Sequence, residues 1–129
     1  MADYPADLRY TKEHEWTRIT DNVARVGITQ FAVDQLGDVT MVELPSEGDS
    51  VEKDQVFGTV ESVKAVSDLY APVSGTVVKV NGDLEDTPEN VNDAPYDGGW
   101  MVKIEMSSAD EAGALMDADA YTKFVAEQD

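Results

Sequence analysis

The sequence predicts a mainly β fold, in the form of a sandwich or a small barrel. Between residues 38 and 104 the chain consists of short runs rich in β-branched residues, interrupted by Gly, Pro, Asn and Asp. Strands this short are typical of antiparallel sandwiches and barrels rather than of βαβ units. A weak internal repeat supports the prediction, because residues 37–49 and 74–86 each contain a glycine, an apolar run and a Gly-Asp turn.

The N-terminal part of the sequence predicts a β-hairpin of about residues 14–28. Its two arms, residues 14–20 and 23–28, flank the dipeptide Asp21-Asn22. Asp and Asn tolerate the positive φ values that a two-residue turn demands. Residues 1–13 are mostly polar and are expected to form an entry arm.

A short helix is predicted directly after this hairpin. Thr29 can cap its N-terminus, and apolar side chains follow at helical spacing from Phe31 to Leu36. Gly37 provides the left-handed residue at which such a helix ends.

The C-terminal tail, about residues 108–127, has helical rather than strand spacing. Ser108 and Glu111 have the positions of a capping box. A second short helix with an apolar stripe, able to lie on the sheets, is predicted from Tyr121, Phe124 and Val125. With a core of about residues 23–105 and no linker, the 129 residues are expected to form one domain.

Composition excludes several classes of function. The chain has 27 acidic and 9 basic residues, and its net charge of −18 should repel nucleic acids and anionic membranes. Without cysteine there are no disulfides, thiolate nucleophiles or Cys-based metal sites, and the single histidine, His14, cannot build a multi-histidine zinc site. The N-terminus lacks targeting character and no apolar run could span a bilayer, so a cytoplasmic protein is expected.

Two conspicuous polar features have ordinary interpretations. His14 lies between Glu13 and Glu15 without a nucleophile as partner. We expect a histidine at a strand edge whose positive charge is stabilised by its acidic neighbours. The acidic run around residues 83–89 lacks EF-hand spacing and is expected to be a solvated loop.

One lysine, Lys64, stands between two strand-like runs. If residues 58–63 and 65–70 form a hairpin, Lys64 lies at its tip, where a modifying enzyme can reach the amine. A Schiff-base lysine is disfavoured, because it needs a lowered pKa, whereas Glu61 and Asp68 favour the charged ammonium. From the residues alone, an ordinary surface lysine and a modification site both remain open.

The sequence around Lys64 resembles the lipoylation hairpin of the glycine cleavage system H protein family. The resemblance begins with ESVKAVSDLYAPVSG, residues 61–75, and covers about residues 8–125. The further matching segments are residues 10–16, 26–29, 36–39, 42–45, 81, 84–88, 95–96 and 99–100. The Met-Lys-Met tip of the related biotinyl carriers is excluded by Val63 and Ala65.

This resemblance implies a lipoyl/biotinyl barrel-sandwich hybrid of two antiparallel sheets with short extra helices. Lys64 would carry lipoic acid in amide linkage, and the tip residues recognised with it would be Glu61, Ser62, Val63 and Ala65. The implied protein is a non-enzymatic carrier with no catalytic residue and no metal site. Its partners would be glycine decarboxylase, aminomethyltransferase, dihydrolipoamide dehydrogenase, and a lipoate ligase or a lipoyl or octanoyl transferase.

The resemblance also implies a surface cleft into which the loaded arm folds back. Carried over by position, Glu15 and Asp68 would pair with the protonated amine of the aminomethyl group, because carboxylates suit an ammonium ion. Glu13 and Gln35 would line the same cleft.

Two other functions fit the same sequence. The modified protein could donate lipoate to other lipoyl proteins, or the protein could be an unmodified acidic adaptor descended from a carrier. For the shuttle a monomer is expected, because a shuttle must leave its partners.

Overall fold

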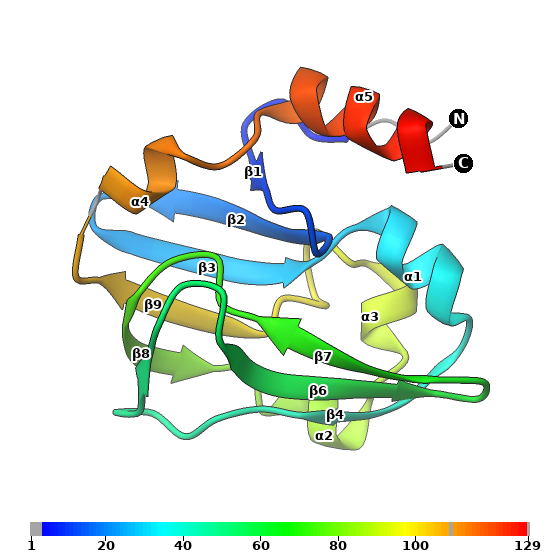
Figure 1. The fold of residues 1–129 in the computed structure, drawn as a ribbon. Helices are drawn as coiled ribbons and strands as arrows, with labels where there is room; N and C mark the ends of the chain where they lie inside the picture. The colour runs from blue at the N-terminus through cyan, green and yellow to red at the C-terminus, as the bar shows by residue number, and fades with distance from the viewer. Residues whose placement is uncertain (1–3, 109, 129) are drawn as a thin grey trace.

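The computed structural model describes residues 4–108 and 110–128, which form two antiparallel sheets with short helices between and beside them (Figure 1). The larger sheet has the strand order β1-β2-β3-β9-β8-β5 and the smaller one β4-β6-β7. The strands are β1 Arg9–Tyr10, β2 Glu15–Thr20, β3 Val23–Ile28, β4 Val39–Glu43, β5 Ser50–Val51, β6 Val56–Ser62, β7 Val66–Tyr70, β8 Gly75–Val80 and β9 Val102–Met106. The predicted fold class is confirmed.

The hairpin and the helix predicted near the N-terminus are both present. β2 and β3 pair from Glu15↔Ile28 to Thr20↔Val23, and Asp21 in their turn has a φ of 56°. Helix α1, Gln30–Leu36, begins after Thr29, whose hydroxyl oxygen accepts a hydrogen bond from the N–H of Ala32. It ends at Gly37, where φ is 77°.

The main hydrophobic core fills the space between the two sheets. It takes buried side chains from β3, β4, β6, β7, β8 and β9, together with residues of the helices. Each strand contributes side chains from its inward face, as the alternation of a half-buried strand requires. The central members of the core include Ala24, Val26, Val60, Leu69, Val73, Val77, Val102 and Ile104.

A second, aromatic cluster lies where the N-terminal segment meets the C-terminal helix α5, Ala118–Gln128, above the larger sheet (Figure 1). Leu8, Tyr10, Trp16 and Tyr121 are almost completely buried in it. The rings of Tyr10 and Tyr121 stack with centroids 4.6 Å apart. The N-terminal segment is therefore part of the packed structure, and the expectation of a polar entry arm is wrong from Leu8 onward.

Two further expectations need correction. The run of residues 83–93 forms two short helices, α2 Asp83–Asp86 and α3 Asn90–Asp93, because Leu84 and Val91 are buried in the main core. Near the C-terminus, α4 spans only Asp110–Gly113. The carboxylate of Glu111 accepts hydrogen bonds from the N–H and the hydroxyl of Ser74, so it ties α4 to the sheet instead of completing a capping box with Ser108.

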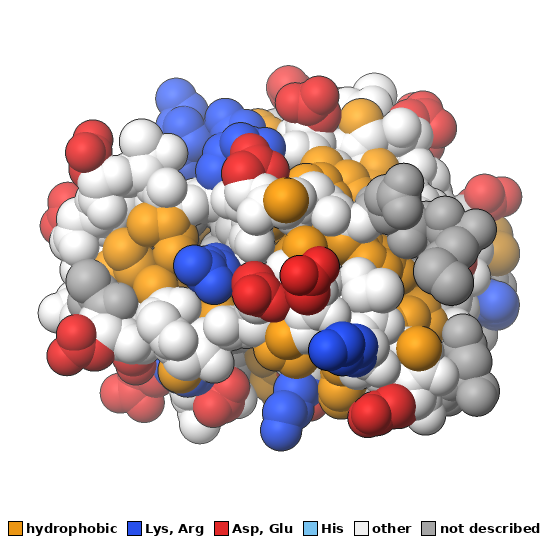
Figure 2. Space-filling view, turned by 90° about the horizontal axis from the view of Figure 1, so that it is seen from above, with side chains coloured by type: hydrophobic (Ala, Val, Ile, Leu, Met, Phe, Trp, Pro, Cys, Tyr) orange, Lys and Arg blue, Asp and Glu red, His pale blue; other side chains and the backbone are white. Residues whose placement is uncertain are grey.

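The face of the molecule seen from above in the orientation of Figure 1 carries acidic, basic and hydrophobic side chains (Figure 2). None of the helices in residues 4–108 and 110–128 combines the length and the hydropathy that crossing a bilayer requires.

Candidate functional site

Lys64 lies at the tip of the hairpin formed by β6 and β7, which projects at one end of the molecule (Figure 1). The strands are closed by a tight turn in which Ser62 N–H donates to Ala65 O at 2.8 Å. The hydroxyl oxygen of Ser62 also accepts from the N–H of Ala65, at 3.1 Å, and from the N–H of Lys64, at 3.4 Å. Lys64 is exposed, and the neighbouring Val63 keeps 70% of its surface accessible. The tip is thus ordered by its backbone and open to solvent.

The stem of Lys64 passes close to the end of α1. A β-carbon built on Gly37 would lie 3.6 Å from Lys64 Cε. Leu36, the residue before Gly37, lines a cleft of about 300 Å³. The lysine stem and the cleft are therefore separated by little more than the C-terminal end of one short helix.

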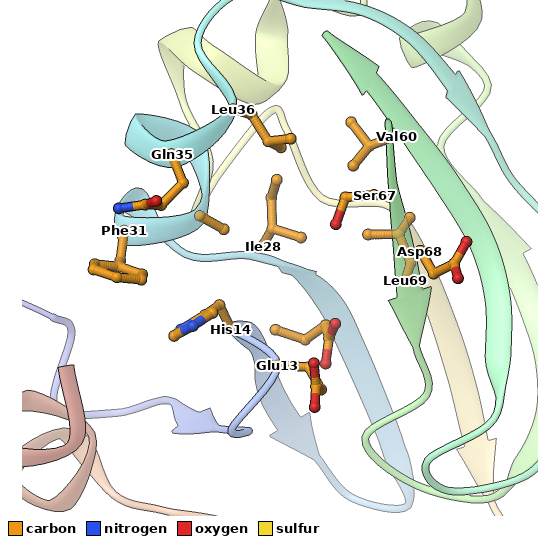
Figure 3. A pocket seen from close by; sticks show the side chains of 12 residues that line it. Glu13, His14, Ile28, Phe31, Gln35, Leu36, Val60, Ser67, Asp68 and Leu69 are labelled. Atoms are coloured by element: carbon orange, nitrogen blue, oxygen red, sulfur yellow. The ribbon is translucent and has the colours of Figure 1, made fainter. Parts of the chain in front are cut away.

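This cleft lies between α1, the start of β2 and the hairpin (Figure 3). In Figure 3, Gln35, Phe31 and His14 lie on one side of the opening and Ser67 lies on the other, whereas the carboxylate of Asp68 points to the opposite side of β7. The cleft is lined by both apolar and polar residues. They are Glu13, His14, Glu15, Ile28, Phe31, Ala32, Gln35, Leu36, Val60, Ser67, Asp68 and Leu69. All four residues that the sequence assigned to one cleft, Glu13, Glu15, Gln35 and Asp68, are among them. The structure brings these four together.

Glu15 differs from the other three because it is buried. Only 1% of its surface is accessible, its Oε1 accepts a hydrogen bond from the Thr11 hydroxyl at 2.7 Å, and its Oε2 accepts one from the N–H of Tyr70 at 3.2 Å. Burial raises the pKa of Glu15 to about 7, although both hydrogen bonds act in the opposite direction. Glu15 is thus a cleft residue whose charge depends on pH near neutrality.

The other three assigned side chains are solvent-exposed. Asp68 belongs to β7, opposite Thr59 of β6, while Glu13 precedes β2 and Gln35 occupies the last turn of α1. In Figure 3 the side chain of Glu13 lies beside the cleft, whereas the carboxylate of Asp68 points away from it, beyond β7. The carboxylate of Asp68 would therefore have to turn around β7 to reach a group held in the cleft.

His14 also lines the cleft, a role that the sequence analysis did not assign to it. Its backbone has a φ of 72°, its Nδ1 lies 2.8 Å from the hydroxyl of Tyr121, and its ring lies 4.5 Å from that of Phe31. Burial lowers the pKa of His14. The expectation of a strand-edge histidine with a stabilised charge is wrong, because the ring is half-buried among aromatic side chains rather than exposed to the neighbouring acids.

The apolar walls of the cleft were also missed. Ile28, Leu36, Val60 and Leu69 are buried, and the alternation within the predicted strands could have placed three of them on an inward face. That alternation does not distinguish the wall of a cleft from the ordinary core. In the part of the chain that the structure describes, no group of three or more acidic or histidine side chains is arranged to hold a metal ion.

Comparison with known proteins identifies the family. The family model of the glycine cleavage H-protein matches residues 8–128. The chain is 54% identical over 125 residues to the glycine cleavage system H protein of Brevibacillus brevis, which covers 97% of this chain and 99% of that protein. It is 56% identical over 127 residues to the protein of the same name from Anaeromyxobacter sp. (strain K), and the match covers 98% of this chain and 99% of that protein.

A solved structure agrees with these sequence relatives. The crystal structure of a glycine cleavage system H protein from Mycobacterium marinum superposes with a TM-score of 0.86 at 37% identity, covering 97% of this chain and 98% of that one. Sequence and fold therefore give the same answer along nearly the whole length of both chains. The chain belongs to the glycine cleavage H-protein family.

Proposed function

We propose that this chain is the lipoyl-bearing shuttle of the glycine cleavage system, a carrier component and not itself an enzyme, with lipoic acid in amide linkage to Lys64. Lys64 would hold the lipoyl group, and the group would supply the thiol and disulfide chemistry of the carrier. The aminomethyl group of glycine would be carried from the pyridoxal-phosphate decarboxylase to the tetrahydrofolate-dependent aminomethyltransferase, and dihydrolipoamide dehydrogenase would be the partner for reoxidation. The observation that carries the proposal is an exposed lysine on an ordered turn, with a cleft opening beside its stem.

The residues near Lys64 fit a long, mostly apolar arm with a polar end. An arm that continues along the lysine stem past Gly37 meets the cleft at Leu36. The walls formed by Ile28, Leu36 and Val60 offer apolar contact to its methylene groups. The exposed carboxylate of Glu13 lies beside the cleft, and that of Asp68 could reach it by turning around β7.

The carboxylates of the cleft suit a cationic amine as cargo. Asp68 and Glu13 can pair with it at the rim, and Gln35 can offer its amide. Glu15, with a pKa of about 7, is close to half-protonated at neutral pH, and an approaching ammonium ion would lower that pKa and favour the carboxylate. Together with the apolar walls, these groups would keep water away from the cargo between visits to the enzymes.

The tip and the net charge suit repeated, short encounters with other proteins. Glu61, Ser62, Val63 and Ala65 surround Lys64 and would be read by a lipoate ligase or by a lipoyl or octanoyl transferase. Amide formation removes the positive charge of Lys64, so the modified tip is more acidic. A net charge of −18 would steer the carrier toward basic rims around the active sites of its partners.

The proposal is tested by replacing Lys64. Protein produced with lipoate and a lipoate ligase should contain a species heavier by one lipoyl group, and Lys64→Arg should abolish both that species and glycine decarboxylation coupled to the partner enzymes. Lys79→Arg, at an exposed lysine of β8, is the matched control and should leave both unchanged. Full turnover by the Lys64→Arg variant would refute the proposal.

The same preparations separate the two other functions. Protein without added mass despite abundant ligase and lipoate would be an unmodified adaptor. Lipoylated protein that does not support glycine decarboxylation, yet passes its lipoyl group to a 2-oxoacid dehydrogenase domain in the presence of a transferase, would be a lipoate donor.

A further inference from the structure

The turn that carries Lys64 is joined to the segment after α1 by a backbone hydrogen bond. The N–H of Val63 donates to the carbonyl oxygen of Asp38, with an N···O distance of 3.0 Å. The side chain of Val63 is largely exposed, so burial does not hold this residue in place. Where the turn lies relative to α1 therefore depends on where the carbonyl of Asp38 is held, together with the pairing of Val39 with Ser62 in the neighbouring strands.

Asn92 of α3 holds the residues on both sides of Asp38. Its Nδ2 donates to the carbonyl oxygen of Gly37 and its Oδ1 accepts from the N–H of Val39, each at 2.8 Å. One side-chain amide thus satisfies a backbone acceptor and a backbone donor, as a neighbouring strand would. Asn92 is partly buried, where hydrogen bonds of this kind are shielded from competing water.

The segment held by Asn92 is one in which the chain changes direction. Gly37 has φ 77° and ψ −152°, a conformation that favours glycine; its N–H closes α1 by donating to the carbonyl oxygen of Val33, and its own carbonyl oxygen accepts from Asn92. The same glycine lies under the Lys64 stem. Asn92 therefore fixes both the backbone beneath the lysine and the carbonyl that anchors the turn, without touching Lys64.

We propose that Asn92 is a positioning residue, which fixes the lysine-bearing turn against the C-terminal end of α1 and so sets the direction in which a group on Lys64 leaves toward the cleft. The statement about the turn stands on the hydrogen bonds alone. The statement about an attached arm rests on the proposed function.

Hydrogen exchange of the unmodified protein tests the first part. In Asn92→Ala the amide of Val63 should exchange at least about fivefold faster, because the carbonyl that accepts its hydrogen bond is no longer fixed. The amide of Val60, in the middle of β6, should be unaffected. Asn90→Ala is the matched control, because Asn90 lies on the same helix and its side chain bonds to Thr87 nearby. Equal exchange of Val63 in the two variants would overturn the inference.

A second variant keeps the test valid if Asn92→Ala loosens the whole hairpin. Asn92→Asp keeps an acceptor for the N–H of Val39 and loses the donor to Gly37. If Val60 also exchanges faster in Asn92→Ala, the Asp variant decides. Faster exchange of Val63 with Val60 unchanged supports the inference, and any other result overturns it.

The direction in which a group attached at residue 64 extends is measured separately. Because the chain has no cysteine, Lys64→Cys offers a single site for a nitroxide label. The label should broaden the amide resonances of Gln35 and Ser67, and adding Asn92→Ala should reduce that broadening at least about twofold; unchanged broadening would contradict the inference. Neither measurement needs lipoate, so failure here leaves the proposed function standing, and an unmodified Lys64 in cells leaves the role of Asn92 standing.

Discussion

The tip of the β6–β7 hairpin and the aromatic cluster under α5 are held in place by different forces. Val63 and Val66 at the tip are 70% and 65% exposed, and the turn is ordered by hydrogen bonds of its backbone and of Ser62. Tyr10, Trp16 and Tyr121 in the cluster are fully buried. The comparison teaches that stability and exposure are provided by different parts of the molecule, because a tip that contributes little burial can contact another molecule without loosening the fold.

The largest effect on stability is expected in the cluster. Tyr121→Ala removes the ring stacked on Tyr10 and the hydroxyl that lies 2.8 Å from His14 Nδ1 and 2.7 Å from the hydroxyl of Thr29. We expect the free energy of unfolding to fall by about 3–5 kcal/mol. Val63→Ala at the tip should change it by less than about 0.5 kcal/mol. Urea denaturation of both variants measures the contrast, which would be lost if the two values were similar.

A pH-dependent effect of intermediate size is expected at Glu15. Its pKa of about 7 in the fold lies above its ordinary value of 4.5, so the folded protein holds this proton more tightly than the unfolded chain. The contribution of Glu15 to stability is greatest below pH 4.5 and falls as the pH rises toward 7, by up to about 3 kcal/mol.

Replacement of the carboxyl isolates this contribution. In Glu15→Gln the side chain stays hydrogen-bonded but no longer ionises, so its stability relative to the natural protein should rise between pH 4.5 and 7. Denaturation curves across this window provide the measurement. A difference between the two proteins that is independent of pH would contradict the assigned pKa.

A smaller effect on the free energy of unfolding is expected at the turn itself. Ser62→Ala removes the hydroxyl that accepts from the N–H groups of Lys64 and Ala65. Since the site is open to solvent, the free energy of unfolding should fall by only about 0.5–1 kcal/mol. The amide of Ala65 should nevertheless exchange several-fold faster, whereas Ser67→Ala, further along the hairpin, should leave it unchanged. Slow exchange of Ala65 in the Ser62→Ala variant would show that other contacts order the turn.

Local signals in the sequence were sufficient for the elements with strong turn or cap residues. Asp21 and Asn22 indicated the β2–β3 hairpin, and Thr29 and Gly37 bounded α1, because each of these signals acts within a few residues. The resemblance over about residues 8–125 assigned Glu13, Glu15, Gln35 and Asp68 to one cleft, which the residue pattern alone could not have done, and all four are among the residues that line it.

The features that sequence reasoning missed depend on distant partners. Tyr10 pairs with Met116 and stacks on Tyr121, so nothing near residue 10 reveals its burial. Glu15 becomes a buried carboxyl through the N–H of Tyr70, 55 residues away. The segment around Leu84 has the composition of a loop, and only packing against the main core makes it helical. Pairs this far apart leave no periodic trace in a single sequence.

The central claim is that Lys64 carries lipoic acid in amide linkage. A peptide map of protein taken from cells that make lipoate tests it most directly. Trypsin should cleave after Lys53 and Lys79 but not after a modified Lys64, giving a peptide of residues 54–79 that carries one lipoyl group. We predict this lipoylated peptide from the natural protein. Protein made without lipoate should instead be cleaved after Lys64 and give a peptide of residues 65–79. Complete cleavage after an unmodified Lys64 in cells with ample lipoate and ligase, or a lipoyl group on another lysine, would contradict the account.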